Sequence, residues 1–123
     1  MSDLRPKSQK ITLNGKEYGV RCTLGVVDEL QDKFDIPISE IGEVLKDERS
    51  AIKNIISLMT IMINEDIDIR RDGGETIDNV NERFVARHLD LTRVREIQDI
   101  LLSSMMASVS GGGNEESPNG KSE

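Results

Sequence analysis

The pair Asn14-Gly15 constrains the fold more than any other feature of this sequence. It is the preferred pair for a two-residue type I′ turn, and a short alternating run flanks it on each side. The pattern predicts a β-hairpin with three facing pairs: Leu13 with Lys16, Ile11 with Tyr18, and Gln9 with Val20. The apolar side chains then share one face: Ile11, Leu13, Tyr18, Val20 and Cys22. Because two strands are not stable alone in water, helices must cover this face.

Helical periodicity begins directly after the hairpin. Thr23 is a candidate N-cap for a first helix, on which Val27, Leu30 and Phe34 recur at three- and four-residue spacing. The pair Ile36-Pro37 ends this helix. A short second helix is expected to start at Ser39 and to carry Ile41, Val44 and Leu45 on one side, although Gly42 weakens it.

The most apolar helix is expected from Ser50, a second candidate cap, to residue 63. Its apolar side chains cover more than one face, so this helix is either central in the domain or also contacts a partner. Residues 64–75 are expected to form a charged loop. A short helix at about 80–88 and a final helix at about 93–108 follow, the last with this apolar stripe: Val94, Ile97, Ile100, Leu101 and Met105.

These elements predict one α+β domain, mainly helical, in which an N-terminal hairpin packs on four to five helices. Residues 1–8 are polar and are expected to form a flexible arm, residues 9–109 the domain, and residues 110–123 a disordered tail without large apolar side chains. Only Tyr18, Phe34 and Phe84 are aromatic, so aliphatic side chains and methionines must form the core.

Net charge and cysteine content narrow the function classes. The formal charge of −7 would repel a phosphate backbone, which argues against nucleic acid as a partner. A single cysteine, Cys22, cannot form an internal disulfide, and the N-terminus lacks the apolar stretch of a signal peptide. No apolar run approaches the ~20 residues of a membrane span. We therefore expect a protein of a reducing cytoplasm.

Few residues could act as catalytic groups or metal ligands, and the sequence predicts no catalytic, cofactor or metal site. His88 is expected at a helix end, where an imidazole interacts with the helix dipole, and Cys22 as a small buried side chain. Acidic residues are concentrated after residue 64, as in a calcium-binding loop. If Gly73 occupied the turn position of such a loop, however, Arg70 and Asn79 would stand at ligand positions, so the spacing argues against calcium. Nothing structured follows the glycines at 111–113, so they are expected to form a linker rather than a phosphate loop.

The arginines concentrate in one part of the sequence: Arg70, Arg71, Arg83, Arg87, Arg93 and Arg95. A groove for nucleic acid is one interpretation. The same window also contains many acidic residues, so a solvated, salt-bridged surface is the better interpretation.

The apolar surplus on two helices suggests a surface for another protein. Methionine is flexible and polarizable and repacks readily against different partners. The candidate partner-binding residues lie on the central and last helices: Ile55, Met59, Met62, Leu102, Met105 and Met106. Each of them could equally belong to the core, and periodicity does not separate the two roles.

The order of these features resembles the tail assembly chaperones of long-tailed bacteriophages and prophages, including their gene-transfer-agent relatives. Three segments carry the likeness: residues 10–18 (KITLNGKEY), residues 24–30 (LGVVDEL) leading to Phe34, and residues 84–92 (FVARHLDLT). The resemblance implies a factor that binds the apolar, helical tape measure protein and keeps it in solution. Such a factor leaves during tail assembly and is absent from the mature virion.

The resemblance also implies a longer form, made by ribosomal frameshifting near the end of the gene, which recruits the major tail tube protein. Gly112-Gly113-Asn114 and Ser117-Pro118-Asn119 can both be encoded by slippery heptamers, so the tail permits this hypothesis, which the gene sequence would test. A frayed C-terminus is the simpler interpretation. Two alternatives for the whole chain remain open: a non-catalytic regulatory or adaptor domain, and a structural tail subunit.

Overall fold

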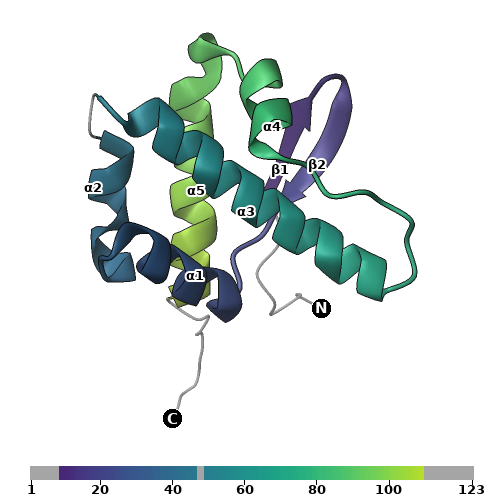
Figure 1. Ribbon diagram of the computed structural model, residues 1–123, viewed down its shortest axis with the longest axis horizontal. Helices are drawn as coiled ribbons and strands as arrows, with labels where there is room; N and C mark the ends of the chain where they lie inside the picture. The colour runs from purple at the N-terminus through teal and green to yellow at the C-terminus, as the bar shows by residue number, and fades with distance from the viewer. Residues whose placement is uncertain (1–8, 47–48, 110–123) are drawn as a thin grey trace, which may run out of the picture.

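The computed structural model describes residues 9–46 and 49–109 and contains one hairpin packed against helices (Figure 1). The fold is α+β and mainly helical, as the sequence predicts. The elements, with η for a 3₁₀ helix, are β1 Gln9–Leu13, β2 Lys16–Val20, α1 Leu24–Phe34, η1 Ile38–Glu40, α2 Ile41–Lys46, α3 Ala51–Asp72, α4 Glu82–His88, η2 Leu91–Arg93 and α5 Val94–Val109. The expected arm (1–8) and tail (110–123) lie outside the described residues.

The hairpin has the predicted register. Ile11 pairs with Tyr18 and Leu13 with Lys16, and Asn14 and Gly15 have φ values of 54° and 74°, as a type I′ turn requires. Ile11, Leu13, Tyr18 and Val20 are buried beneath the helices. Cys22 is only partly buried and packs at the edge of the core.

Helix α3 is the centre of the domain. It contacts β2 and helices α1, α2, α4 and α5, and it crosses in front of α5 (Figure 1). The core gathers around it: Ile11, Leu13, Tyr18, Val20, Val26, Leu30, Ile41, Leu45, Ile55, Leu58, Met59, Met62, Ile63, Ile67, Val85, Ile97, Leu101 and Met105. The apolar character of this helix on more than one face therefore follows from its central position.

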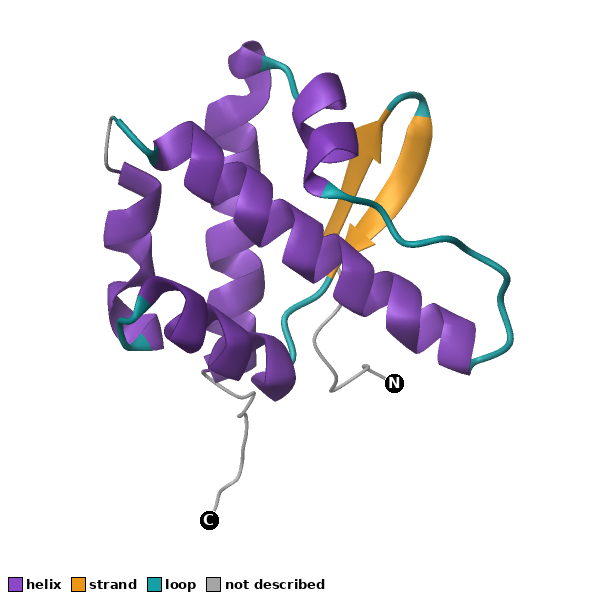
Figure 2. Ribbon diagram, in the orientation of Figure 1, coloured by secondary structure: helices purple, strands orange, loops and turns teal. Residues whose placement is uncertain are grey.

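The end of α3 differs from the sequence prediction. Residues 64–72, expected as part of a charged loop, continue the helix, and only 73–81 form the connection to α4 (Figure 2). The expectation was wrong because it counted charges and missed that two residues of this segment face the core: Asp66 and Ile67 are each 1% exposed.

Two of the α-helices begin with a side-chain cap. The Thr23 hydroxyl accepts a hydrogen bond from the Val26 N–H, and the Asn81 side chain accepts one from Phe84 at the start of α4. Ser50 stands at the N-cap position of α3, but its hydroxyl makes no capping hydrogen bond. The second helix begins with a 3₁₀ turn, η1, rather than at Ser39 directly.

Candidate functional site

The structure separates the six candidate partner-binding residues into two groups. Ile55, Met59 and Met62 on α3 are 0% exposed, so the expectation that they form a surface is corrected: α3 is covered on all sides that carry them. On α5, Met105 is 2% exposed, Leu102 is half-buried and Met106 is 61% exposed. Only the α5 residues border open space.

Those α5 residues form one wall of an apolar groove with a volume of about 470 Å³. The opposite wall comes from η1 and α2. The lining residues are Ile38, Ser39, Ile41, Gly42, Leu102, Met105 and Met106. We call this surface the α2/α5 groove. Sequence reasoning found its α5 wall and missed the η1 and α2 wall, because which elements face each other depends on the tertiary fold.

Gly42 lies in the wall of the α2/α5 groove, where there is room for a side chain. A Cβ atom built on this residue would have Leu102 Cδ2 as its nearest neighbour, at 4.0 Å, which is an ordinary van der Waals contact. A glycine inside a helix costs roughly 1 kcal/mol relative to alanine. There is therefore room for a side chain at position 42. The glycine that makes the second helix appear weak in the sequence lies in the wall of the groove.

The chemistry of the α2/α5 groove suits an apolar ligand. None of its lining residues is charged, and its only side chain with a polar group is that of Ser39. The thioethers of Met105 and Met106 can adjust to different shapes. Exposed acids, Glu40 and Glu43, lie in the elements that form one wall. A partner segment with an apolar stripe would fit this surface.

The most buried charge of the described chain lies elsewhere, where the hairpin meets α3. Arg21 Nε and Nη2 donate hydrogen bonds to Asp66 Oδ1 at 3.1 and 3.0 Å, and Arg70 Nη1 lies 3.6 Å from Asp66 Oδ2. The Arg21 N–H also donates to the carbonyl of Met62 at 3.1 Å. These contacts fasten the hairpin to α3, and we assign them a structural role.

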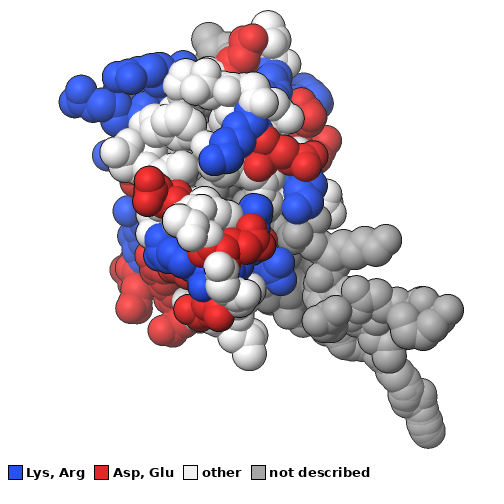
Figure 3. Space-filling view, turned by 90° about the vertical axis from the view of Figure 1, so that its right-hand side faces the viewer, with Lys and Arg blue, Asp and Glu red and all other residues white. Residues whose placement is uncertain are grey.

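Several arginines are paired, as the sequence suggested. Arg70 binds Glu75 at 2.9 Å, and Arg71 binds Asp68 at 2.7 Å. The hydrogen bonds from Arg70 lower the pKa of the Glu75 carboxyl, and Glu75 in turn raises the pKa of Arg70. On the side of the hairpin and of the loop after α3, positive and negative side chains are interspersed (Figure 3). This surface is salt-bridged rather than uniformly basic.

His88 and Phe84 belong to an aromatic cluster at the hairpin. The Phe84 ring lies 6.0 Å from Tyr18, edge to face, and 4.8 Å from His88. His88 is the last residue of α4, where the sequence placed it. Within the described ranges, no group of three or more His, Cys, Asp or Glu side chains is arranged to hold a metal ion.

Comparisons with family models, with curated proteins and with solved structures found no match to this chain. None of the helices within 9–46 and 49–109 combines the length and the hydrophobicity of a membrane-spanning segment.

Proposed function

We propose that this chain is a tail assembly chaperone that binds an apolar helical segment of a tape measure protein in the α2/α5 groove. The observation that carries the proposal is the groove itself: an uncharged, methionine-containing hollow of about 470 Å³, with room for a side chain beside Gly42. The resemblance of residues 10–18, 24–34 and 84–92 to that chaperone family supports the choice of partner. No step of this function requires a catalytic residue or a cofactor.

Physically, the groove would act as a temporary cover for apolar side chains. A long helix with exposed apolar residues aggregates unless those residues are shielded from water. Burial of such side chains against Leu102, Met105 and Met106 supplies the affinity, at roughly 25 cal/mol per Å² before the entropic costs of association. The net charge of −7 keeps the resulting complexes apart.

The chaperone would then release its partner as tube subunits assemble. A groove of this size covers only a short part of a long helix, so several copies would bind along one partner and each would bind weakly. Recruitment of the major tail tube protein by a frameshifted longer form remains part of this proposal, and the residues concerned, 110–123, lie outside the described part of the chain.

Co-expression with the tape measure protein encoded by the neighbouring gene tests the proposal. We expect the wild-type chain to raise the amount of tape measure protein in the supernatant and to co-purify with it. Met106→Asp places a charge in the groove, and Gly42→Leu fills it. Both should reduce co-purification at least fivefold.

Two control variants separate the groove from general effects. Gly42→Ala adds only a methyl group where there is room for it, and Leu24→Asp changes a different exposed apolar residue, 75% exposed on α1. Both should co-purify as the wild type does. If the folded wild-type chain leaves the tape measure protein insoluble and unbound, the chaperone function is wrong and an adaptor role becomes the better proposal. Detection of the chain in purified virions would instead favour a structural subunit.

A further inference from the structure

A second apolar hollow lies between the first half of α3 and α4, away from the α2/α5 groove. Two adjoining cavities, of about 210 and 550 Å³, share Ile52, Ile56 and Ala86 in their walls. Leu89 and Val94 extend the apolar floor on one side. Ile52 is 40% exposed. We call the combined surface the α3/α4 groove.

Cations border the α3/α4 groove. Arg49, Lys53 and Arg83 line it, and all three are exposed. Arg87 is exposed one turn further along α4. None of these four residues forms an ion pair with any residue that the structure describes, in contrast to Arg21, Arg70, Arg71 and Arg93.

The two acids at the same surface already have hydrogen-bond partners. Glu82 Oε2 accepts a hydrogen bond from the Ser57 hydroxyl at 3.2 Å. Asp90 Oδ1 accepts one from the Thr92 N–H at 3.0 Å, and this bond lowers the pKa of the Asp90 carboxyl. Both carboxylates keep their negative charge, so this surface carries two acids and four cations, and the cations are in excess.

We propose that the α3/α4 groove binds an acidic amphipathic helix of a partner protein. The apolar side chains of that helix would contact Ile52 and Ile56, and its carboxylates would face Arg49, Lys53 and Arg83. The apolar floor favours such a helix over nucleic acid, which would need contacts to phosphates rather than to isoleucines. Charge complementarity favours an acidic partner, because the cations at this surface outnumber its two acids in a chain with a net charge of −7.

A titration of the ¹⁵N-labelled full chain with a synthetic peptide tests the inference. The peptide is about five helical turns long, with leucines at helical spacing and glutamates on the remaining face. We expect its addition to shift the amide signals of residues 49–56 and 82–90 and to leave those of 38–42 and 102–106 unchanged. The affinity should fall as the salt concentration rises.

Matched variants test which charged residues contribute to binding of the peptide. Lys53→Glu combined with Arg83→Glu should weaken binding at least tenfold, whereas Lys33→Glu, an exposed substitution on α1, should change it less than twofold. Ile52→Ser should weaken binding without changing its salt dependence. The amide spectrum of each variant shows whether it is folded.

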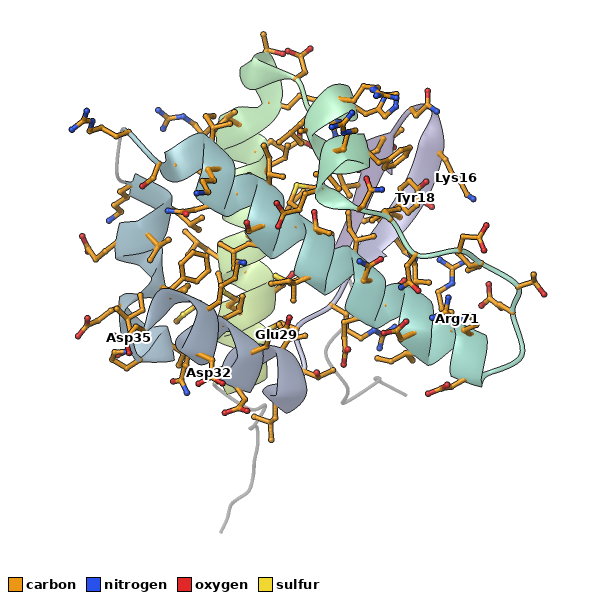
Figure 4. The ribbon with its side chains drawn as sticks, in the orientation of Figure 1. Lys16, Tyr18, Glu29, Asp32, Asp35 and Arg71 are labelled. Atoms are coloured by element: carbon orange, nitrogen blue, oxygen red, sulfur yellow. The ribbon has the colours of Figure 1, made fainter. Side chains whose placement is uncertain are left out.

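Four results would overturn the inference. A peptide with lysines in place of the glutamates could bind as tightly, or the double charge reversal could leave the affinity unchanged. Single-stranded oligonucleotides could shift the same amides more strongly than the peptide does. Finally, the free chain could self-associate in a manner that Arg83→Glu abolishes. That result would assign the groove to a second copy, whose α1 carries the acids Glu29 and Asp32, with Asp35 directly after the helix (Figure 4).

Discussion

At the scale of single residues, Gly19 and Asp66 depend on each other. A Cβ atom on Gly19 would overlap the Asp66 carboxylate, whose buried oxygen atoms lie directly over the strand. The backbone of Gly19 has no positive φ, so glycine is needed here for space and not for its conformational freedom. The hairpin can approach α3 closely only because this strand position lacks a side chain.

Gly19→Ala is therefore expected to lower the free energy of unfolding by about 1–3 kcal/mol, the usual cost of overpacking a well-packed site. Urea denaturation followed by circular dichroism measures this change. Gly25→Ala is the matched control, because its Cβ would lie 3.6 Å from the nearest atom, the Thr23 hydroxyl oxygen. That control should be neutral or stabilising. Equal stability of the two variants would contradict the close packing of Gly19 on Asp66.

The Glu75 carboxyl gives a prediction for pH dependence. Its pKa is lowered in the folded state by hydrogen bonds from Arg70. A lowered folded pKa adds stability that is present above the unfolded pKa and is lost as pH falls through the folded one. An NMR titration should show the midpoint for Glu75 below its ordinary value and moved upward in Arg70→Gln. An unchanged midpoint in that variant would exclude Arg70 as the cause.

At the scale of elements, α3 needs its tertiary contacts to extend to Asp72. The second half of this helix carries many charges, and its stability comes from the side that faces the hairpin, where Asp66 binds Arg21 and Ile67 enters the core. The Thr23 hydroxyl donates a hydrogen bond of 2.6 Å to Glu65 from the start of α1. The helix end is thus held by the residues that follow β2.

Asp66→Ala should destabilise the protein by about 1–2 kcal/mol, since the charge-assisted hydrogen bonds are lost while both arginines can return to water. Hydrogen exchange should accelerate for amides 66–72 more than for amides 55–62. The control is Asp68→Ala, which removes an exposed ion pair with Arg71 and should cost no more than about 0.5 kcal/mol. Uniform acceleration along α3 would show that its second half has no separate dependence on Asp66.

The elements that could be predicted from the sequence are those with local determinants. The hairpin register follows from Asn14-Gly15, and the start of α1 follows from Thr23, because turns and caps involve neighbouring residues. The end of α3 and the burial of Met59 and Met62 depend on contacts between distant segments. Periodicity identifies an apolar stripe, but it does not say whether another helix covers that stripe.

For the whole molecule, one central helix explains where surfaces for partners are available. Because the middle of α3 is enclosed, the apolar hollows lie where neighbouring helices leave a gap: between α2 and α5, and between the start of α3 and α4. The first gap is uncharged in its lining and the second is bordered by cations. The two grooves are therefore suited to chemically different partners.

Methyl NMR can show whether the tape measure protein binds in the α2/α5 groove. The chain is labelled with ¹³C-methyl methionine and its spectrum is compared free and in complex with that partner. We predict that the Met105 and Met106 signals shift while those of Met59 and Met62, enclosed in the core, do not. Co-purification of the partner with unchanged Met105 and Met106 signals would contradict binding in this groove, as would shifts confined to Met59 and Met62.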